Sequence, residues 1–498
     1  MNNNDLLPSG WTHTELGVIL PLQYGKALRE DDRNATGSFA VYGSSGLVGK
    51  HSIALTKGAS IIVGRKGNVG ATYFSPDPCW PIDTVYFIDG TPSTNLKFFS
   101  YLLTWLGLVR LDRSTAVPGL SRDDYSPLRV PMPPATEQKR IVEAIESYLT
   151  KLDAAVAALE RVRANLKRYR ASVLKAAVEG RLVPTEAELA RKEGRDFEPA
   201  SVLLDRILAE RRRRWEESEL ARMKAAGKPP KDDRWKSKYK EPVTPDSSTL
   251  PHLPDGWCWA TVEQLGEVSG GLTKNQTREK IATRLPYLRV ANVYTNELRL
   301  DEIFDIGVES SEVPRVRLQP GDLLVVEGNG SSDQIGRVAL WDGSIDPCVH
   351  QNHLIKVRFW IEILSRWTLN WLMSPAGRSL VSRAASSTSG LNTLSISKVA
   401  RLSVPLAPLS EQARAITELE RRESVITEAI ETVTKSEKRT ARLRQSILKR
   451  AFEGKLVDQD PSDQPASLLL ETIRAERAAA APYRKPKKLE ARHTEAAK

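Results

Sequence analysis

The most regular hydrophobic pattern of the chain lies between residues 141 and 173, where apolar residues recur at alternating steps of four and three. Its positions are Ile141, Ile145, Tyr148, Leu152, Ala155, Leu159, Val162, Leu166, Tyr169 and Val173. A heptad repeat of this length predicts a coiled-coil helix. Thr136 supplies a start signal and Gly180 a stop signal. A helix over 137–179 would be roughly 65 Å long, so we interpret it as a spacer.

A second, weaker seam occurs near the end of the chain. Its apolar positions are Leu419, Ile426, Ala429, Val433, Leu443 and Ile447, and Arg422, Ser436 and Thr440 interrupt it. One strong and one weak seam can pair as an antiparallel coiled coil, although the heptads alone do not identify the partner of either helix. A shorter helix is predicted after each long one, over 201–224 and 467–480.

Outside the long helices, short apolar runs alternate with glycine turns in two regions. In the first region, strands are predicted at 52–55, 60–63, 71–74 and 84–88, followed by a helix over 95–108. In the second region, strands at 323–326, 337–341 and 354–359 precede a helix through 367–373. Both regions are therefore expected to form compact α+β modules, each large enough to bury its own core.

The chain repeats itself over a very long period. Leu-Pro-x-Gly-Trp at 7–11 returns at 253–257, and Val-Pro-x-x-Pro-x-x-Glu-Gln at 130–138 returns at 404–412. Ser-x-Leu-Lys followed by Glu-Gly-x-Leu-Val occurs at 172–183 and again at 446–457, and Pro-Ala-Ser at 199–201 returns at 465–467. The segments 12–128 and 258–402 share little. The chain is thus interpreted as a duplication in which a similar frame carries a divergent insert.

This duplication predicts the domain organisation. The expected parts are a globular domain at 1–135, a helical spacer at 136–225, a basic Pro/Lys-rich linker at 226–252, a second globular domain at 253–409, and a helical spacer with a tail at 410–498. The expected fold class is α+β, with two globular modules separated by two long helices that form an antiparallel coiled coil. The duplication implies pseudo-two-fold symmetry.

The charge of the chain points to a polyanionic partner. The 498 residues carry a formal net charge of +11, and 40% of them are hydrophobic, as in a folded, soluble protein. A basic excess of this size favours nucleic acid. Residues 206–240 contain 13 basic and 6 acidic side chains, with four consecutive arginines at 211–214. That run fits DNA phosphates, an acidic protein surface, or simply a solvated face and linker.

The cysteines and the N-terminal sequence suggest a cytoplasmic protein. Cys79, Cys258 and Cys348 lie far apart, which argues against a disulfide framework and suits a reducing compartment. Residues 1–10 lack the pattern of a signal peptide, and no apolar run is long enough to span a bilayer.

Catalytic motifs are not matched. The stretch 43–50 resembles a P-loop, but five residues separate its glycines and a histidine follows its lysine. The glycines of 64–70 do not form the dinucleotide fingerprint. Cys-x-His-x-x-His at 348–353 lacks a fourth ligand nearby, so a structural role is favoured over zinc. We find neither an amino-methyltransferase motif nor a nuclease cluster, and we predict no catalytic residue, metal or cofactor on this chain.

A glycine-rich loop follows a buried strand in each module, at 64–70 and at 327–332. Glycine lets the backbone approach a phosphate, and the polar side chains of these loops suit phosphates or base edges. Glycine turns between strands are also common for geometric reasons alone. Both interpretations stay open.

Taken together, these motifs resemble those of type I restriction-modification specificity subunits. The resemblance rests on the paired Leu-Pro-x-Gly-Trp, Glu-Gln and Glu-Gly-x-Leu-Val motifs and on His-Gln-Asn-His at 350–353, and it covers essentially the whole chain. No single motif is decisive, but two copies in the same order are specific. The resemblance implies two target-recognition domains, each of which reads one half of a gapped DNA site, with helix length setting the gap.

The resemblance also implies partners and cofactors. Double-stranded DNA, two adenine methyltransferase subunits and restriction/translocase subunits are the expected partners. S-adenosylmethionine, ATP and Mg²⁺ are expected on those subunits, with none on this chain. The exposed faces of 141–173 and 415–447 are expected to dock the modification subunits.

Base-reading residues do not transfer from the family, because the inserts diverge. Our candidates rest on residue type and loop position: Arg and Lys suit guanine or phosphate, and Asn and Gln suit adenine. In the first domain they are Ser44, Ser45, Arg65, Lys66, Asn68 and Arg122; in the second they are Arg289, Asn292, Asn329, Ser331, Ser332 and Gln351.

Two other classes of function remain as alternatives. A single-chain methyltransferase or nuclease would turn over alone and would carry a cofactor motif. A coiled-coil scaffold joining two protein-binding domains would show no salt-dependent affinity for DNA.

Overall fold

The structure is a computed structural model and describes residues 7–112, 119–246, 248, 250–328, 334–385 and 393–480. The chain divides into two compact units, of which unit 1 comprises 1–161 with 433–498 and unit 2 comprises 162–432. The division runs through both long helices, α4 (Ala135–Val178) and α13 (Leu409–Phe452). Each unit therefore contains parts of both repeats. The domain boundaries drawn from the repeat stay a prediction.

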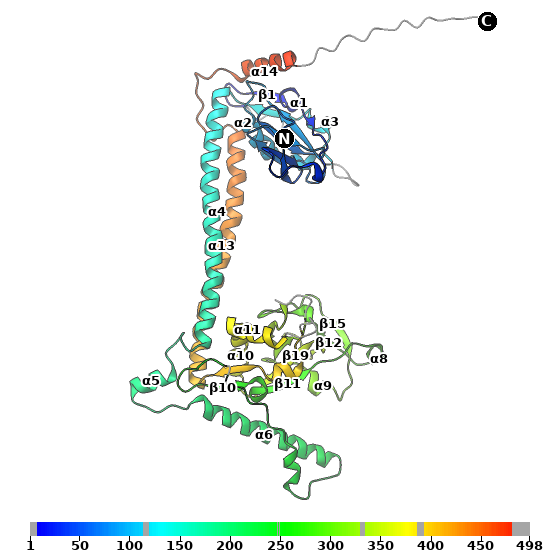
Figure 1. Cartoon of the computed structure of the whole chain (residues 1–498), viewed down its shortest axis with the longest axis vertical. Coiled ribbons are helices and arrows are strands. Elements are labelled where there is room, and N and C mark those ends of the chain that lie inside the picture. The colour runs from blue at the N-terminus through cyan, green and yellow to red at the C-terminus, as the bar shows by residue number, and fades with distance from the viewer. Residues whose placement is uncertain are drawn as a thin grey trace, which may run out of the picture. The chain divides into compact units, whose positions relative to one another are not determined.

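Unit 1 holds the first α+β module and the last helix of the described chain (Figure 1). Besides its parts of α4 and α13, its elements are β1 (Thr12–Glu15), α1 (Leu16–Ile19), β2 (Gln23–Tyr24), η1 (Glu30–Asp32), β3 (Phe39–Gly43), β4 (Gly46–His51), β5 (Ser60–Gly64), β6 (Thr72–Ser75), β7 (Cys79–Pro81), β8 (Val85–Asp89), α2 (Leu96–Leu106), η2 (Leu108–Leu111), α3 (Arg122–Tyr125), β9 (Arg129–Met132) and α14 (Ala466–Ala480).

Unit 2 holds the second module. Besides its parts of α4 and α13, its elements are α5 (Glu186–Glu193), α6 (Ala200–Ala225), η3 (Asp233–Lys238), β10 (Cys258–Thr261), α7 (Val262–Leu265), β11 (Gly266–Gly270), α8 (Gln276–Glu279), β12 (Arg284–Leu288), η5 (Val290–Asn292), β13 (Val293–Tyr294), β14 (Glu297–Leu298), β15 (Phe304–Gly307), α9 (Val313–Val316), β16 (Leu323–Val326), β17 (Val338–Leu340), β18 (Val349–His350), β19 (Leu354–Phe359), α10 (Ile363–Met373), α11 (Pro375–Ala385), α12 (Ile396–Ala400) and β20 (Ser403–Leu406).

The two modules share one sheet plan although their sequences diverge. Each has a four-stranded antiparallel sheet, in the order β2-β8-β5-β6 in unit 1 and β11-β19-β16-β17 in unit 2. Each also has a three-stranded sheet with one parallel pair, β4-β3-β7 and β15-β12-β18. A two-stranded ribbon, β1-β9 or β10-β20, leads into the long helix that follows. The duplication seen in the frame therefore extends to the inserts.

The core of unit 1 is formed by residues from both ends of the chain. Helix α2 begins where the Asn95 side chain accepts a hydrogen bond from the Phe98 backbone N–H at 3.1 Å. Phe98 is fully buried and meets Phe452 of α13 edge to face, with 5.5 Å between ring centroids. Burying an aromatic side chain of this size stabilises the fold by about 1.5–3 kcal/mol. The C-terminal helices are thus part of the first module.

In each unit the two long helices pair antiparallel. In unit 1, Ile141 and Ile145 share a core with Leu448 and Phe452, and Asp153 forms an ion pair with Arg444. In unit 2, α4 residues 173–177 pack on Leu419, whereas the earlier Arg170 pairs with the later Glu423 at 2.8 Å. Rising numbers in α4 meet falling numbers in α13 in both units, which confirms the antiparallel coiled coil.

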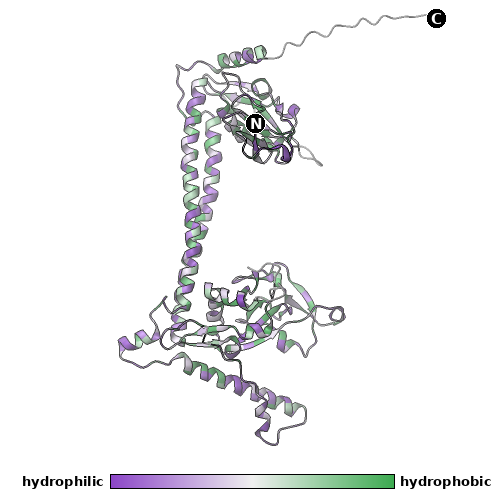
Figure 2. Cartoon of the chain, viewed as in Figure 1, coloured by the Kyte–Doolittle hydropathy of each residue, from purple (hydrophilic) through white to green (hydrophobic). Residues whose placement is uncertain are grey.

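The predicted seam of α4 is buried only in part. Ile141, Ile145 and Val173 are buried, but Tyr148, Val162 and Tyr169 remain 44–47% exposed. Hydrophobic and hydrophilic residues mix along both long helices (Figure 2). Arg422, one of the interruptions of the second seam, interacts with the Tyr169 side chain, so a charged residue lies where a fully apolar seam would need an apolar one.

The prediction placed one strand wrongly and left out several elements. Residues 52–55 form no strand; their place is taken by β4, which pairs with β3. Ile53 is 62% exposed, so its apolar side chain misled the assignment. Helices α5 and α11 were not predicted: α5 is nucleated by a capping box between Thr185 and Glu188. Among the described helices, none combines the length and apolar character needed to cross a membrane.

Candidate nucleic-acid interface

Two predicted arginines of unit 1 converge on one aromatic ring. Arg65 follows strand β5 and Arg122 begins α3, and their guanidinium carbons lie 5.4 and 4.9 Å from the ring centroid of Tyr24. The Leu120 N–H donates to the Arg65 carbonyl at 3.0 Å, which holds the two segments together. Tyr24 is 53% exposed, Arg122 is exposed and Arg65 is half-buried. Such a cation–aromatic cluster can contact phosphates and base edges.

The Arg65 guanidinium is oriented by the main chain. Its Nε and Nη2 atoms donate to the Asp83 carbonyl at 3.1 and 2.6 Å. The neighbouring Tyr86 ring lies 5.0 Å from Tyr24, and burial together with the interaction of its hydroxyl with Tyr24 raises the pKa of Tyr86 to about 12. Tyr86 therefore stays neutral near neutral pH.

The remaining candidates of unit 1 lie on two adjacent loops. Ser44 and Ser45 form the turn between β3 and β4, and the Tyr73 hydroxyl donates to the Ser44 carbonyl at 3.2 Å. A Cβ atom placed on Gly67 would lie 3.1 Å from the Ser44 Oγ atom, so this turn touches the loop 65–68. Lys66 and Asn68 on that loop are exposed. The structure thus brings the six predicted residues of unit 1 into one region.

Backbone geometry explains why the loop 64–70 contains three glycines. Gly67 and Gly70 adopt φ values of +76° and +73°, which favour glycine. A Cβ on Gly64 would lie 2.0 Å from the Asn68 carbonyl oxygen, and the Gly70 N–H donates to the Gly64 carbonyl at 2.9 Å. The glycines make a tight turn, and the turn presents the side chains of 65–68.

In unit 2, Asn292 shapes a loop from within. It is 3% exposed; its Oδ1 accepts from the Arg289 backbone N–H at 2.9 Å, and its Nδ2 donates to the carbonyls of Arg299 and Glu302 at 2.8 and 3.0 Å. Both amide hydrogens of Asn292 are used inside the chain. We therefore assign Asn292 to positioning the loop, and we no longer propose it as a contact with DNA.

Arg289 repeats the arrangement of unit 1. Its guanidinium carbon lies 4.0 Å from the ring centroid of Phe304, which is 44% exposed, and its Nη2 pairs with Glu302 at 3.0 Å. Gln351 is half-buried at the end of β18. The other candidates of this unit, Asn329, Ser331 and Ser332, lie outside the described residues.

The prediction missed the aromatic partners. Tyr24 and Phe304 are exposed aromatic residues that stack with predicted arginines, one in each unit. Tyr24 lies on a short edge strand beside a polar residue, where the local sequence gives no reason for its ring to be buried. An exposed aromatic residue of this kind could have indicated a binding site. The arginines of these two pairs were predicted and their aromatic partners were not, because charge can be read from the sequence whereas stacking depends on tertiary structure.

The residues that resembled a metal motif are engaged separately. The ring Nδ1 of His350 lies 2.9 Å from the Leu354 carbonyl, and that of His353 lies 2.8 Å from a Glu327 carboxylate oxygen. Burial lowers the pKa of His350 to about 3, so this ring is neutral. The buried Cys348 thiol contacts the Val349 carbonyl. The structural role favoured for the motif stays a prediction.

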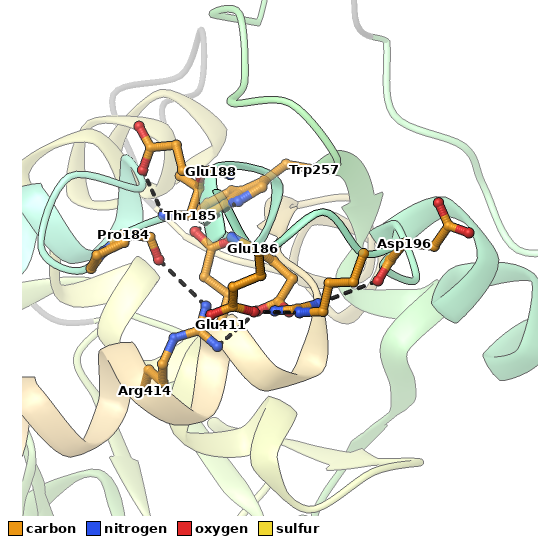
Figure 3. Close-up of polar contacts among 10 residues, drawn as sticks. Pro184, Thr185, Glu186, Glu188, Asp196, Trp257, Glu411 and Arg414 are labelled. Atoms are coloured by element: carbon orange, nitrogen blue, oxygen red, sulfur yellow. Dashed lines mark hydrogen bonds and ion pairs between the residues drawn. The ribbon is translucent and has the colours of Figure 1, made fainter. Parts of the chain in front are cut away.

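A polar junction joins the two repeats inside unit 2 (Figure 3). The carboxylate of Glu411, which is 1% exposed, accepts from the Trp257 indole N–H at 3.0 Å and from the Glu186 backbone N–H at 2.8 Å. Arg414 forms an ion pair with the Glu186 carboxylate at 2.7 Å. Although burial opposes it, hydrogen bonds from Arg195 and Arg414 leave the pKa of Glu186 below its usual value.

Unit 1 contains the matching junction with the repeats exchanged. Glu137 accepts from the Trp11 indole N–H at 2.9 Å and from the Gln459 amide at 2.8 Å, and Arg140 pairs with Asp463 at 2.7 Å. In each unit the Trp and Glu come from one repeat, and the segment after the long helix comes from the other. The repeat motifs therefore serve to close each unit with a segment of the other repeat.

Comparison with known proteins finds similarity to specificity subunits of type I restriction enzymes. A family model described as the type I restriction modification DNA specificity domain matches residues 8–163. The EcoKI specificity subunit of Escherichia coli strain K12 is 26% identical over 365 residues, which are 71% of this chain and 64% of that subunit. The match thus spans somewhat less than two thirds of the length of this relative. The EcoBI subunit of Escherichia coli is 25% identical over 84% of this chain and 80% of its own length.

Further similarities extend over nearly the whole chain. The EcoDI specificity subunit of Escherichia coli is 22% identical over 95% of this chain and 96% of its own length. A solved chain described under complex assembly and conformational transition of the type I R-M system covers 90% of this chain and 99% of that chain, at 16% identity and a TM-score of 0.53. The latter similarity supports the fold.

Proposed function

We propose that this chain belongs to the specificity-subunit family of type I restriction-modification enzymes and that it is the non-catalytic subunit that selects the DNA sequence for such a complex. One observation carries the proposal: two modules with the same sheet plan present different loops. A shared plan with divergent loops suits two recognition domains that read different bases.

Each unit is proposed to read one half of a bipartite, gapped site. In unit 1 the readers are Arg65 and Arg122 on Tyr24, with the turn at 44–45 and the loop 65–68 beside them. In unit 2, Arg289 and Gln351 are proposed as readers. Arginine suits guanine and glutamine suits adenine in the major groove, and each good bidentate pair contributes about 1–3 kcal/mol of discrimination.

Catalysis is proposed to lie on partner subunits. Two adenine methyltransferase subunits and restriction/translocase subunits would bring S-adenosylmethionine, ATP and Mg²⁺, and we propose no cofactor for this chain. The modification subunits would dock on the half-covered helix faces, where Tyr148, Tyr169 and Val425 are 46–57% exposed. Exposed apolar side chains on a helix favour association with another protein. Action on DNA with these partners would take place in the cytoplasm.

The test is the adenine methylome of a host that carries the cognate modification subunit, with and without this chain. A gapped, two-part motif that appears only with the chain is expected. Its absence, with the complex shown to assemble, would contradict the proposal and favour the scaffold alternative. A continuous motif would contradict reading by both units.

A pair of variants sharpens the same measurement. Arg65→Ala with Arg122→Ala is expected to relax one half of the motif and leave the other half unchanged. The matched control, Arg129→Ala with Lys139→Ala, removes the same charge from β9 and the exposed start of α4. It is expected to leave both halves unchanged.

A further inference from the structure

The most basic segment of the chain forms an ordered arm on unit 2. We call residues 206–240 the basic arm; it contains the second part of α6, the turn after it and η3. Its 13 basic and 6 acidic side chains give it a net charge of +7, within a chain whose total is +11. The family motifs do not include this segment.

Aromatic contacts fold the basic arm back on itself. Trp215 of α6 stacks on Trp235 with 5.9 Å between centroids and lies 5.3 Å from the Tyr239 ring. Arg211 donates to the Tyr239 hydroxyl and, at 3.1 Å, to the Lys240 carbonyl. The return segment is therefore held against α6 instead of serving as a loose linker. Ordering it places Lys238 and Lys240 at fixed positions, which has an entropic cost that a plain linker would avoid.

The basic arm forms one wall of a cleft of about 1350 Å³. Strand β11, Trp360, Asn352 and the residues around α12 form the rest of the wall. We call it the arm cleft. All of its lining residues belong to unit 2.

Three cations at the arm cleft are exposed and have no partner in the part of the chain that the structure describes: Lys238, Lys240 and Arg401. The carboxylates of the cleft are already engaged. Glu263 lies 3.8 Å from Arg211, and Glu327 lies 2.8 Å from His353. The remaining one, Glu267, interacts electrostatically with Lys356 and Arg358. With five basic and three acidic side chains along its lining, the arm cleft carries a formal net charge of +2.

We propose that the arm cleft binds the phosphate backbone of duplex DNA beside the half-site read by unit 2. The inference rests on the proposed function. Two observations favour DNA over an acidic protein segment. Asn352 lines the cleft next to the predicted base-reading Gln351. Three unpaired cations lie on two segments that face the same cleft, Lys238 and Lys240 at the end of η3 and Arg401 after α12, which suits contacts to the DNA backbone. Lys238, Lys240 and Arg401 thus extend the footprint of unit 2 beyond the bases that it reads.

The test compares two triple variants of the full-length chain, assembled with its modification subunit. One is Lys238→Gln, Lys240→Gln, Arg401→Gln. The control, Lys224→Gln, Lys228→Gln, Lys231→Gln, removes the same charge from exposed residues of the same arm that do not line the cleft. Both are compared with the wild type. The affinity for a DNA duplex that contains the motif found in the methylome is measured at salt concentrations from 50 to 200 mM.

Loss of three phosphate contacts is expected to reduce the slope of log K against log salt by about 2.7. Over this fourfold range of salt, that is roughly a 40-fold smaller loss of affinity for the cleft variant than for the wild type. The control is expected to change the slope by less than about 1, because its charges only contribute through screened, long-range attraction. Shortening the DNA on one flank of the site is expected to abolish the difference in slope between the cleft variant and the wild type. Shortening it on the other flank is expected to leave that difference unchanged.

The outcomes separate this inference from the proposed function. Sequence-specific binding by the wild type with equal slopes for the two variants overturns the inference alone. Absence of any sequence-specific binding by the assembled wild type overturns both. Normal DNA binding combined with loss of subunit assembly in the cleft variant would show that the cleft takes an acidic protein segment, and would also overturn the inference. Equal thermal unfolding of the two variants establishes that both are folded.

Discussion

Replacing Glu411 by glutamine is expected to weaken unit 2 more than the matching change weakens unit 1. The carboxylate of Glu411 accepts two hydrogen bonds, from the Trp257 indole N–H and the Glu186 backbone N–H. Neither donor can become an acceptor. In Glu411→Gln, one of them faces an amide NH₂ group and loses its partner, while the size of the side chain is unchanged.

The matching residue of unit 1 has a more adaptable partner. Glu137 accepts from the Trp11 indole N–H and from the side-chain amide of Gln459, which is exposed. In Glu137→Gln the Gln459 amide can rotate and offer its oxygen, so both hydrogen bonds persist. The two variants therefore differ in one buried donor.

An unsatisfied buried donor costs about 1–3 kcal/mol, so Glu411→Gln is expected to lower the free energy of opening of its junction by that amount. Glu137→Gln is expected to cost less than about 1 kcal/mol, because neutral hydrogen bonds replace charge-assisted ones. In populations, the cost of Glu411→Gln corresponds to about 5–150 times more opening of the unit 2 junction than in the wild type.

Native-state amide hydrogen exchange measures this opening locally. The readout is the exchange of the amides of α5 in unit 2 and of 459–466 in unit 1, in conditions where exchange reports the opening equilibrium. Equal changes in the two variants would refute the argument from donor type. An unchanged exchange rate in Glu411→Gln would show that the junction does not depend on these two hydrogen bonds.

Three further predictions follow from particular contacts. Arg65→Ala is expected to weaken binding to one half-site about 10–100-fold, which competition with half-site mutants measures; equal loss at both half-sites would contradict it. Hydrogen bonds from Arg278 lower the pKa of Glu312 to about 2, so the stabilisation by Glu312 is complete above pH 4.5 and is lost as the pH falls towards 2. Urea unfolding of Glu312→Gln should accordingly depend less on pH in that window than the wild type, and an unchanged dependence would contradict the assignment. Gly454→Ala places a Cβ 2.3 Å from the Pro8 Cγ at a φ of +68°, and thermal unfolding of unit 1 is expected to shift down by the equivalent of about 1–3 kcal/mol, whereas no shift would show that Pro8 yields freely.

Much of the candidate interface was predictable from the sequence. Loops and charges are local features, so the sequence drew attention to Arg65, Arg122 and Arg289, and the structure places each of them against an aromatic ring. Their contact with DNA stays a prediction. The burial of Asn292 was not predictable, because it depends on the carbonyls of Arg299 and Glu302, which a turn brings back to it. The order of the basic arm was missed for the same reason.

The sequence by itself determined the duplication, the long helices and the alternation of strands and turns, because these are periodic or repeated patterns. It did not determine which copy of each motif closes which unit. The same motifs occur in both repeats, so pairing within a repeat fits the local pattern as well as pairing between repeats. Tertiary packing decides it: Gly180 lies against Pro254 and Gly454 against Pro8, each glycine meeting the other repeat. Contacts between residues this far apart in the chain depend on shape complementarity, which no local pattern records.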